Sequence, residues 1–228
     1  MHFIIIGIFI IAIVYGPQLW ARHTFNRYSN HQDHFPGTGG ELARHLLDKF
    51  DLQSVKLEKT ELGDHYDPES RTVRLSPANY NDKSLTAISV AAHEVGHAIQ
   101  HAQDHPMLNM RSRLVKTAVV AEKMGSLAMI AIPVITLLTR APGAGVLMFI
   151  LAISSMLVST LVHLVTLPVE WDASFKKALP ILKSGEYVSP QEIAATEKIL
   201  RAAALTYVAG SLASLLNLWR WLAILRRR

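Results

Sequence analysis

The sequence contains no cysteine. This absence excludes a disulfide framework and any metal site built on thiolates, so histidine and carboxylate side chains are the zinc ligands that remain. Charged residues are also scarce: they make up 18% of the 228 residues, whereas 50% of the chain is hydrophobic and the mean hydropathy is +0.22. This composition is typical of a membrane protein with a modest polar part.

The chain also lacks a basic stripe of the kind that binds nucleic acid. Its net charge is +5, but the basic residues gather beside apolar segments. The residues concerned are Arg22, Arg27, Arg111, Arg113, Lys116, Arg226, Arg227 and Arg228. Because this arrangement is typical of the flanks of membrane helices, we expect no nucleic-acid partner.

Four apolar segments are predicted to cross a bilayer, at residues 3–20, 124–139, 141–169 and 202–225. The first has no Lys or Arg before it and no small-x-small cleavage site after it, which favours an anchor over a removed signal peptide. Arg140 and its neighbours alone separate the second segment from the third. These two segments therefore predict a tight membrane hairpin.

The polar part of the chain, residues 22–116, carries signals for a helix and for strands. The sequence TGGE at residues 38–41 is typical of a helix start, and we expect that helix to reach Phe50. Residues 55–58 and 71–75 alternate in hydrophobicity, and residues 64–70 between them have turn chemistry. We predict a small β-hairpin directly before the next helix.

That next helix contains a His-Glu-x-x-His motif in the run AAHEVGHAIQ, residues 91–100. His93 and His97 are four positions apart, so both imidazoles lie on one helix face and can reach one ion. Zn²⁺ binds imidazole nitrogen readily, and a catalytic zinc keeps one position open for water. Glu94 is placed to take a proton from that water as it attacks a carbonyl.

The surroundings of the motif favour a helix. Asp82 or Ser84 can cap its start, and Asp104-His105-Pro106 ends it, because proline disfavours helix in the preceding residue. Gly96 lowers the helix propensity by ~1 kcal/mol, which makes sense if another backbone packs close to the metal-binding face. The alternative is a buried amphipathic helix that carries two histidines by coincidence.

A catalytic zinc site usually has three protein ligands, so a third must come from elsewhere. His101 lies two turns beyond His93, which is too far at ~5.4 Å per turn. The metzincin pattern would place a third histidine at position 103, but Gln103 stands there and excludes that class. His65 and His105 remain open as ligands.

Glu170 is a better candidate for the third ligand. It follows the apolar segment 141–169, and Pro168 lets the helix bend so that the carboxylate can turn toward a site at the membrane surface. A solvated carboxylate at the helix end is the alternative. Asp172 cannot share the face of Glu170, because positions two apart diverge on a helix, and it is better suited to orienting a ligand histidine.

Five short motifs follow one another along nearly the whole chain. They are Tyr15-Gly16-Pro17, TGGELAR at residues 38–44, DHYDP at residues 64–68, the histidine motif at residues 93–101, and LPVEWDAS at residues 167–174. Together they resemble the YugP-like family of membrane-bound neutral zinc metallopeptidases. More distantly, the layout is similar to HtpX and the type I CAAX prenyl proteases, which share a hairpin edge strand, a His-Glu-x-x-His helix and a downstream glutamate ligand.

The resemblance implies that Glu170 joins His93 and His97 in binding one Zn²⁺ ion. The chain departs from HtpX-like enzymes at Ser174, where those enzymes have an aspartate four residues after the glutamate. No role of that aspartate is therefore carried over to this chain, and a role for Asp172 stays open.

These observations predict a mostly α membrane protein with about four transmembrane helices and a small α+β, zincin-like soluble part that contains a short β-hairpin. We expect five regions. They are a transmembrane anchor at residues 1–21, the zincin-like region at 22–116, a transmembrane hairpin at 117–140 and 141–169, a helical region with the third ligand at 170–201, and a transmembrane helix with a basic tail at 202–228.

The expected activity is zinc-dependent hydrolysis of peptide bonds, with Glu94 as the general base. Residues 71–76 would pair with an extended substrate backbone, and Arg201 or Tyr207 would stabilise the oxyanion. A membrane adaptor or chaperone with a structural zinc is the alternative, although such a site has no use for Glu94. Intramembrane cleavage is disfavoured, because residues 85–100 are too short and too mixed in polarity to span a bilayer.

The expected location is the cell membrane, as a multi-pass protein in contact with the lipid bilayer. Basic residues beside the catalytic regions favour a cytoplasmic active site, whereas the arginine tail at residues 226–228 argues for the opposite orientation. The expected partner is a polypeptide substrate, including membrane and misfolded proteins. The sequence does not indicate the oligomeric state or any partner subunit.

Overall fold

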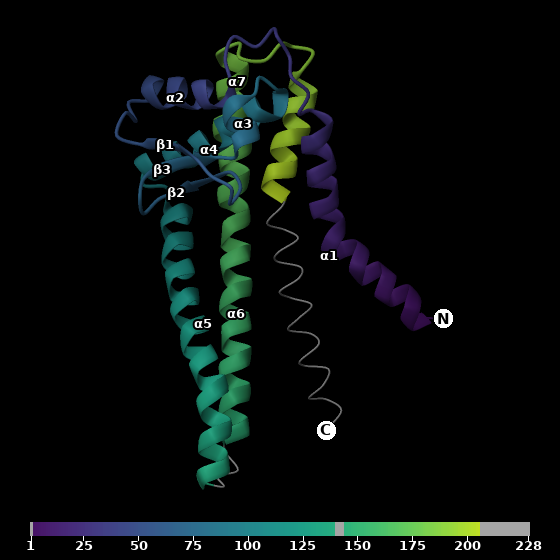
Figure 1. The fold of residues 1–228 in the computed structure, drawn as a ribbon, viewed down its shortest axis with the longest axis vertical. Coiled ribbons are helices and arrows are strands. Elements are labelled where there is room, and N and C mark those ends of the chain that lie inside the picture. Colours follow the sequence, from purple (N-terminus) through teal and green to yellow (C-terminus); the bar gives the residue numbers. More distant parts are fainter. Residues whose placement is uncertain (1, 140–143, 206–228) are drawn as a thin grey trace.

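The computed structural model describes residues 2–139 and 144–205. A compact head carries the sheet and the short helices, and two long helices, α5 and α6, run away from it side by side (Figure 1). The elements are α1 (His2–Arg27), α2 (Gly39–Lys49), β1 (Lys56–Lys59), β2 (His65–Asp67), β3 (Thr72–Leu75), α3 (Pro77–Asn81), α4 (Leu85–Ala102), α5 (Pro106–Thr139), α6 (Ala144–Trp171), the π-helix η1 (Asp172–Ala178), α7 (Leu179–Ser184) and a helix over residues 193–205.

Helix α4 lies at the centre of the head, and every residue of it from Leu85 to Gln100 is buried. It packs against α2, α3, the sheet and η1. The hydrophobic core therefore surrounds α4 on several sides, and it includes Leu46, Leu47, Val73, Leu75, Val95, Leu182, Ile199 and Leu200. This burial fixes the helix that carries the histidine motif.

The starts of α2 and α4 follow from side-chain caps. The Thr38 hydroxyl accepts a hydrogen bond from the Glu41 backbone N–H, and the Glu41 carboxylate accepts one from the Thr38 backbone, so α2 begins with a complete capping box. Ser84, one of the two predicted caps, accepts a hydrogen bond from the Ala87 backbone N–H at the start of α4. Helix α4 ends at Ala102, and Pro106 begins α5.

The sheet has three strands in the order β1-β3-β2. Residues 55–58 and 71–75 were predicted to form a hairpin, but β1 and β3 run parallel. The true hairpin joins β2 to β3, with Tyr66 opposite Val73. The reason lies in Asp67, whose carboxylate accepts hydrogen bonds from the Glu69 backbone and the Ser70 hydroxyl and so confines the turn to the residues after β2.

The prediction of four transmembrane helices is wrong for the part of the chain that the structure describes: none of its helices combines the length and the apolar character needed to cross a bilayer. The apolar runs of the sequence belong to longer helices that also carry charge. Helix α5 carries Arg111, Arg113 and Lys116 in its first half. Helix α6 carries Glu170 near its end, and this glutamate is buried in the head. Most of the predicted fourth span lies beyond residue 205, outside the described residues.

Candidate metal centre

Two imidazoles and one carboxylate converge where α4 meets the end of α6. The Nε2 atoms of His93 and His97 each lie 3.2 Å from Oε2 of Glu170. One candidate ligand atom from each residue lies within 4.8 Å of the others, and all three side chains are buried. Glu170, which lies 73 positions after His97 in the sequence, thus supplies a carboxylate to the pair of histidines.

The approach of these segments depends on Gly96, which faces η1 between the two histidines. A Cβ atom at this position would lie 2.9 Å from the backbone oxygen of Ala173 and 3.3 Å from Cβ of Lys177. Only a residue without a side chain lets the two backbones come this close. The expectation that another backbone packs against this face of the helix is confirmed.

His93 is held by Ser174, on the first turn of η1. Its Nδ1 atom lies 3.0 Å from the Ser174 Oγ, and the same hydroxyl donates a hydrogen bond of 3.1 Å to the backbone oxygen of Leu200. A hydroxyl has one proton to donate. Since that proton goes to Leu200, Nδ1 of His93 must carry the proton of the other bond, which leaves the lone pair of Nε2 directed at Glu170.

His97 is held in the same way by Gln100. The amide nitrogen of Gln100 donates to the backbone oxygen of Val169 at 2.9 Å and to Oδ2 of Asp172 at 2.8 Å. Its amide oxygen must then accept the proton of His97 Nδ1, 2.9 Å away. The Nε2 lone pair of His97 therefore also points to Glu170. Asp172, whose role was left open by the sequence, is thus connected to His97 through Gln100.

These residues fit a zinc ion. Four ligands about 2.0 Å from a tetrahedral zinc are about 3.3 Å apart, close to the 3.2 Å that separates Glu170 Oε2 from each Nε2 atom. Among the residues that the structure describes, the second oxygen of Glu170, Oε1, is buried and has no hydrogen-bond partner. A donor set of two neutral imidazoles and a carboxylate, with three protein ligands, is one that catalytic zinc uses.

Opposing influences act on the Glu170 carboxyl. Its burial alone would raise the pKa, but the neighbouring imidazoles of His97 and His93 outweigh the burial and hold the pKa well below its usual range. Arg111 adds positive charge, with Nη1 3.6 Å from Oε1. The lowered pKa favours the ionised carboxylate, which is the form that binds a metal ion.

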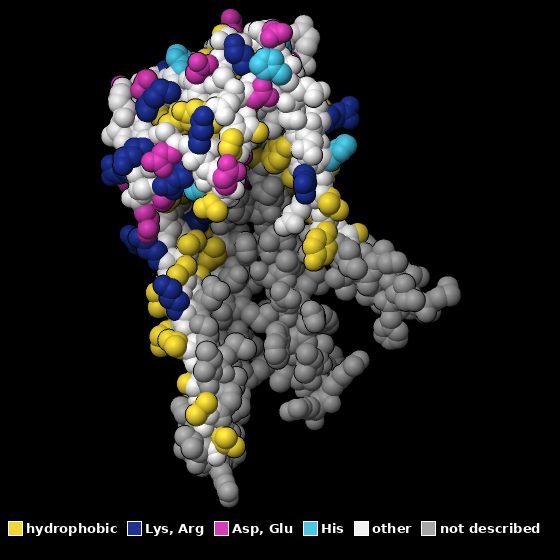
Figure 2. All heavy atoms as spheres, viewed as in Figure 1, with side chains coloured by type: hydrophobic (Ala, Val, Ile, Leu, Met, Phe, Trp, Pro, Cys, Tyr) yellow, Lys and Arg dark blue, Asp and Glu magenta, His cyan; other side chains and the backbone are white. Residues whose placement is uncertain are grey.

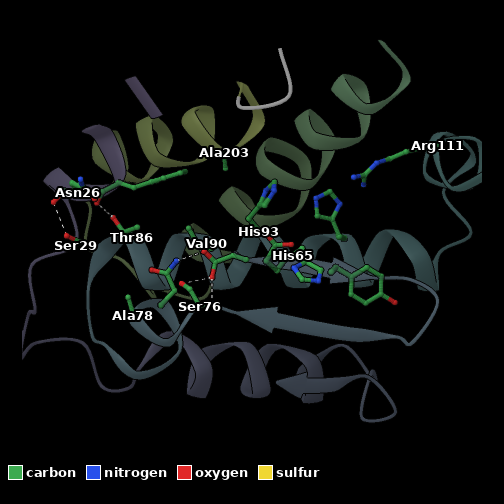
Figure 3. A pocket seen from close by; sticks show the side chains of 16 residues that line it. Asn26, Ser29, His65, Ser76, Ala78, Thr86, Val90, His93, Arg111 and Ala203 are labelled. Atoms are coloured by element: carbon green, nitrogen blue, oxygen red, sulfur yellow. Dashed lines mark hydrogen bonds between the residues drawn. The ribbon is translucent and has the colours of Figure 1, made fainter. Parts of the chain in front are cut away.

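A cleft of about 470 Å³ opens over this cluster. His93, Glu94 and His97 line it from α4, His65 lines it from β2, and Arg111 extends into it from α5 (Figure 3). Burial raises the pKa of the Glu94 carboxyl to about 7, with His93 opposing the rise. A carboxyl group with a pKa near neutrality is suited to taking up and returning a proton.

The chain matches, over residues 3–226, the family described as "Putative neutral zinc metallopeptidase". It is 36% identical over 226 residues to the "Putative membrane protease YugP" of Bacillus subtilis (strain 168), and the match covers 98% of this chain and 96% of the relative. The chain belongs to this YugP-like metallopeptidase family. No solved structure matches the chain.

The candidate metal centre leaves several residues predicted from the sequence outside the cluster. The Nδ1 atom of His65 lies 2.8 Å from the Gly63 backbone oxygen, so His65 lines the cleft without joining the ligands. His105 lies 3.8 Å from Asp172 instead. Arg201 is exposed and does not line the cleft, and Tyr207 lies outside the described residues.

Three polar residues of the candidate metal centre were missed by sequence reasoning. Gln100 stands one turn after His97, so its spacing was a usable signal. Ser174 was noted only as a departure from HtpX-like enzymes, yet it makes the contact to His93 itself. No sequence signal distinguished Arg111 from the other basic residues near the apolar segments.

Proposed function

We propose that the chain is a zinc-dependent endopeptidase whose ligands are His93, His97 and Glu170. The observation that carries the proposal is the convergence of these three buried groups beside a cleft that His93, His97 and Glu94 line. The membership in a family named for zinc metallopeptidases supports it. When bound, Zn²⁺ supplies Lewis-acid chemistry, because it lowers the pKa of water and polarises a carbonyl oxygen.

Glu94 supplies the proton transfers that peptide hydrolysis requires. One water molecule is consumed: its oxygen bonds to the scissile carbonyl carbon, and the C–N bond breaks. Glu94 is adjacent to His93 and only 6% exposed, and in this role it accepts a proton from the water and returns it to the departing nitrogen. Arg111 and His65 line the cleft, and they replace the exposed Arg201 as candidates for stabilising negative charge on the carbonyl oxygen.

The substrate backbone is expected to pair with β2. Residues 71–76 were predicted for this role, but β3 lies between β1 and β2, so both of its edges are occupied. Within the described residues, β2 pairs only with β3, and its His65 and Tyr66 line the cleft. Main-chain hydrogen bonds along such an edge hold an extended peptide with little dependence on its sequence, which suits unfolded or misfolded substrates.

Substitution of Glu94 by Gln tests the activity. We expect the variant to keep its zinc and to lose cleavage of an unfolded substrate by about 10²- to 10⁴-fold, because the base is removed and the ligands are intact. The measurement is zinc content by metal analysis together with kcat/KM on a fluorogenic peptide. Glu61→Gln, on an exposed loop, is the matched control and should behave as the wild type. Cleavage by Glu94→Gln at the wild-type rate would show that Glu94 is not the base.

The adaptor or chaperone with a structural zinc is the second candidate. Such a protein would bind zinc and unfolded protein but would cleave neither peptides nor proteins. The substitution Glu94→Gln would leave its binding of both unchanged. The open cleft beside the donor set favours the peptidase, because a structural zinc is enclosed by four protein ligands.

We also propose that the chain works at a membrane. The relative from Bacillus subtilis is named as a membrane protease, and in this chain large hydrophobic residues such as Leu127, Val134 and Leu137 are exposed along α5. Contact of this surface with lipid would remove it from water. Flotation with liposomes tests the contact: a chain that stays at the bottom of the gradient does not bind lipid. The cytoplasmic position of the site stays a prediction.

A further inference from the structure

A second cavity, of about 510 Å³, lies beside the candidate active-site cleft. Tyr66 and Arg111 line both cavities, so the two are adjacent parts of one groove. Asp64 and His65 line only the cleft, whereas Asp67 lines only the second cavity. The groove therefore follows β2 from its first residue to its last, away from the zinc ligands.

One wall of the second cavity is an apolar strip of α5. Val115, Val119 and Val120 line it, and all three are exposed, Val120 at 60%. Hydrophobic side chains follow α5 where it leaves the charged head (Figure 2). At the rim, Nζ of Lys116 lies 3.0 Å from Oε1 of Glu69. An exposed apolar surface with a polar rim is typical of a binding site.

Tyr66 forms the boundary between the two cavities and is held in place. Its hydroxyl lies 2.7 Å from Nδ1 of His101, on the buried helix α4. Burial raises the pKa of Tyr66 to about 12, so the phenol stays neutral. The second cavity thus has a fixed aromatic side, contributed by the strand along which a substrate would lie, and an aliphatic side contributed by α5.

We propose that the second cavity is a subsite that binds an apolar side chain of the peptide substrate, such as that of Leu, Met or Phe. The inference rests on the proposed peptidase function, because it requires a peptide paired along β2. An extended peptide advances about 3.3 Å per residue, so a side chain within about three residues of the scissile bond reaches this cavity. The groove runs past Asp67 on one side of the zinc ligands, so the preference falls on one side of the cleaved bond.

A set of fluorogenic peptides tests the subsite in the full chain loaded with zinc. The peptides share one cleavable bond, and at each of three positions on either side of it a Leu is exchanged for Asp. At one position we expect kcat/KM to be at least about tenfold higher for Leu, as for other hydrophobic pockets. Val119→Asp should bring that ratio close to one. Thr117→Asp places the same charge on the same helix, away from the cavity, and should keep the ratio.

A second variant guards against misfolding of Val119→Asp. Val119→Phe fills the cavity and leaves the wall apolar. With an additional peptide that carries Ala at that position, the preference should shift from Leu to Ala. If the variants cleave at the wild-type ratio while cleavage still depends on zinc and on Glu94, the subsite is refuted and the peptidase function stands. If the wild-type chain with zinc cleaves none of the peptides, the peptidase function is refuted, and the subsite with it.

Discussion

At the scale of single residues, the two ligand histidines are oriented by uncharged partners. Ser174 and Gln100 accept the Nδ1 protons of His93 and His97, and they are themselves fixed by backbone oxygens of Leu200 and Val169. A neutral acceptor fixes the tautomer without adding charge, so the net charge of the site is set by Glu170, Glu94, Arg111 and the ion.

Removal of the Ser174 hydroxyl should weaken zinc binding. In Ser174→Ala, Nδ1 of His93 loses its acceptor, and we expect the zinc affinity to fall by about 10- to 100-fold, as for other partners of metal ligands. Competition with a chromogenic chelator measures this affinity. Ser184→Ala, at an exposed serine of the following helix, should leave it unchanged. An unaltered affinity in Ser174→Ala would mean that the hydroxyl does not orient the ligand.

Residue types and spacing were enough to predict part of the site. His93, Glu94 and His97 follow from the period of one helix, and Glu170 followed from its position and from the family resemblance. The spacing of Gln100 one turn after His97 was a signal of the same kind. The contact of Ser174 with His93 and those of Gln100 with Val169 and Asp172 could not be predicted by these means, because they depend on the rotation of residues 170–178 about their axis. That segment changes from α-helix to π-helix at Asp172, and periodicity does not reveal the change.

At the scale of elements, the contact between α4 and η1 should be the most sensitive to added volume. Gly96→Ala gains helix propensity of about 1 kcal/mol, but its Cβ atom would press on the Ala173 oxygen at 2.9 Å. We expect a net destabilisation of about 1–3 kcal/mol, as in other overpacked cores, visible as a lower Tm. Gly16→Ala in α1, where a Cβ atom meets nothing within 4 Å, should not lower the Tm.

The turn between β2 and β3 should make stability depend on acid. The hydrogen bond from Ser70, with further bonds from Arg74 and the backbone, lowers the pKa of Asp67 to about 2. The carboxyl group of Asp67 thus binds a proton less readily in the folded state than in the unfolded chain. The stabilisation of the fold by the ionised Asp67 is therefore present above about pH 4 and is lost as the pH falls toward 2. Asp67→Asn should lower the Tm at pH 7 and match the wild type near pH 2. Equal Tm values at pH 7 would contradict this.

The same turn explains why the strand order was not predicted. The alternation at residues 55–58 and 71–75 indicated strands correctly, but alternation does not specify a partner. Residues 64–70 looked like one long turn, because a three-residue strand leaves almost no periodic signal. Only the hydrogen bonds of Asp67 separate the strand from the turn.

At the scale of the whole molecule, the metal centre joins segments that are far apart in the sequence. Helix α4 and the end of α6 contribute the candidate ligands, and η1 contributes Ser174, the partner of His93. The helix over residues 193–205 fixes Ser174 through the backbone oxygen of Leu200. Zinc at a thousandfold excess over its Kd should stabilise the fold by about 4 kcal/mol. Chelation should therefore lower the Tm by roughly 10 °C, and added zinc should restore it. In Glu170→Gln the Tm should hardly respond to zinc.

The prediction from the sequence that differs most from the structure also belongs to this scale. Apolar runs were interpreted as four membrane spans, whereas no described helix meets the requirements for crossing a bilayer. Composition alone does not say which apolar residues face a neighbouring helix, as in the packed pair α5 and α6, and which face the outside. The charges that accompany the runs, such as Arg111 and Glu170, proved to belong to the site itself.

The edge strand β2 is only three residues long, and it would bind a substrate through backbone hydrogen bonds. In a folded target protein the backbone N–H and C=O groups are already hydrogen-bonded, so they cannot pair with β2. In a locally unfolded molecule of the same target they can. When opening and closing are faster than cutting, the lifetime of each target follows the fraction of its copies that are open. On the proposed peptidase function, heat or damage that opens a target protein would shorten the half-life of that target without any change in the peptidase itself.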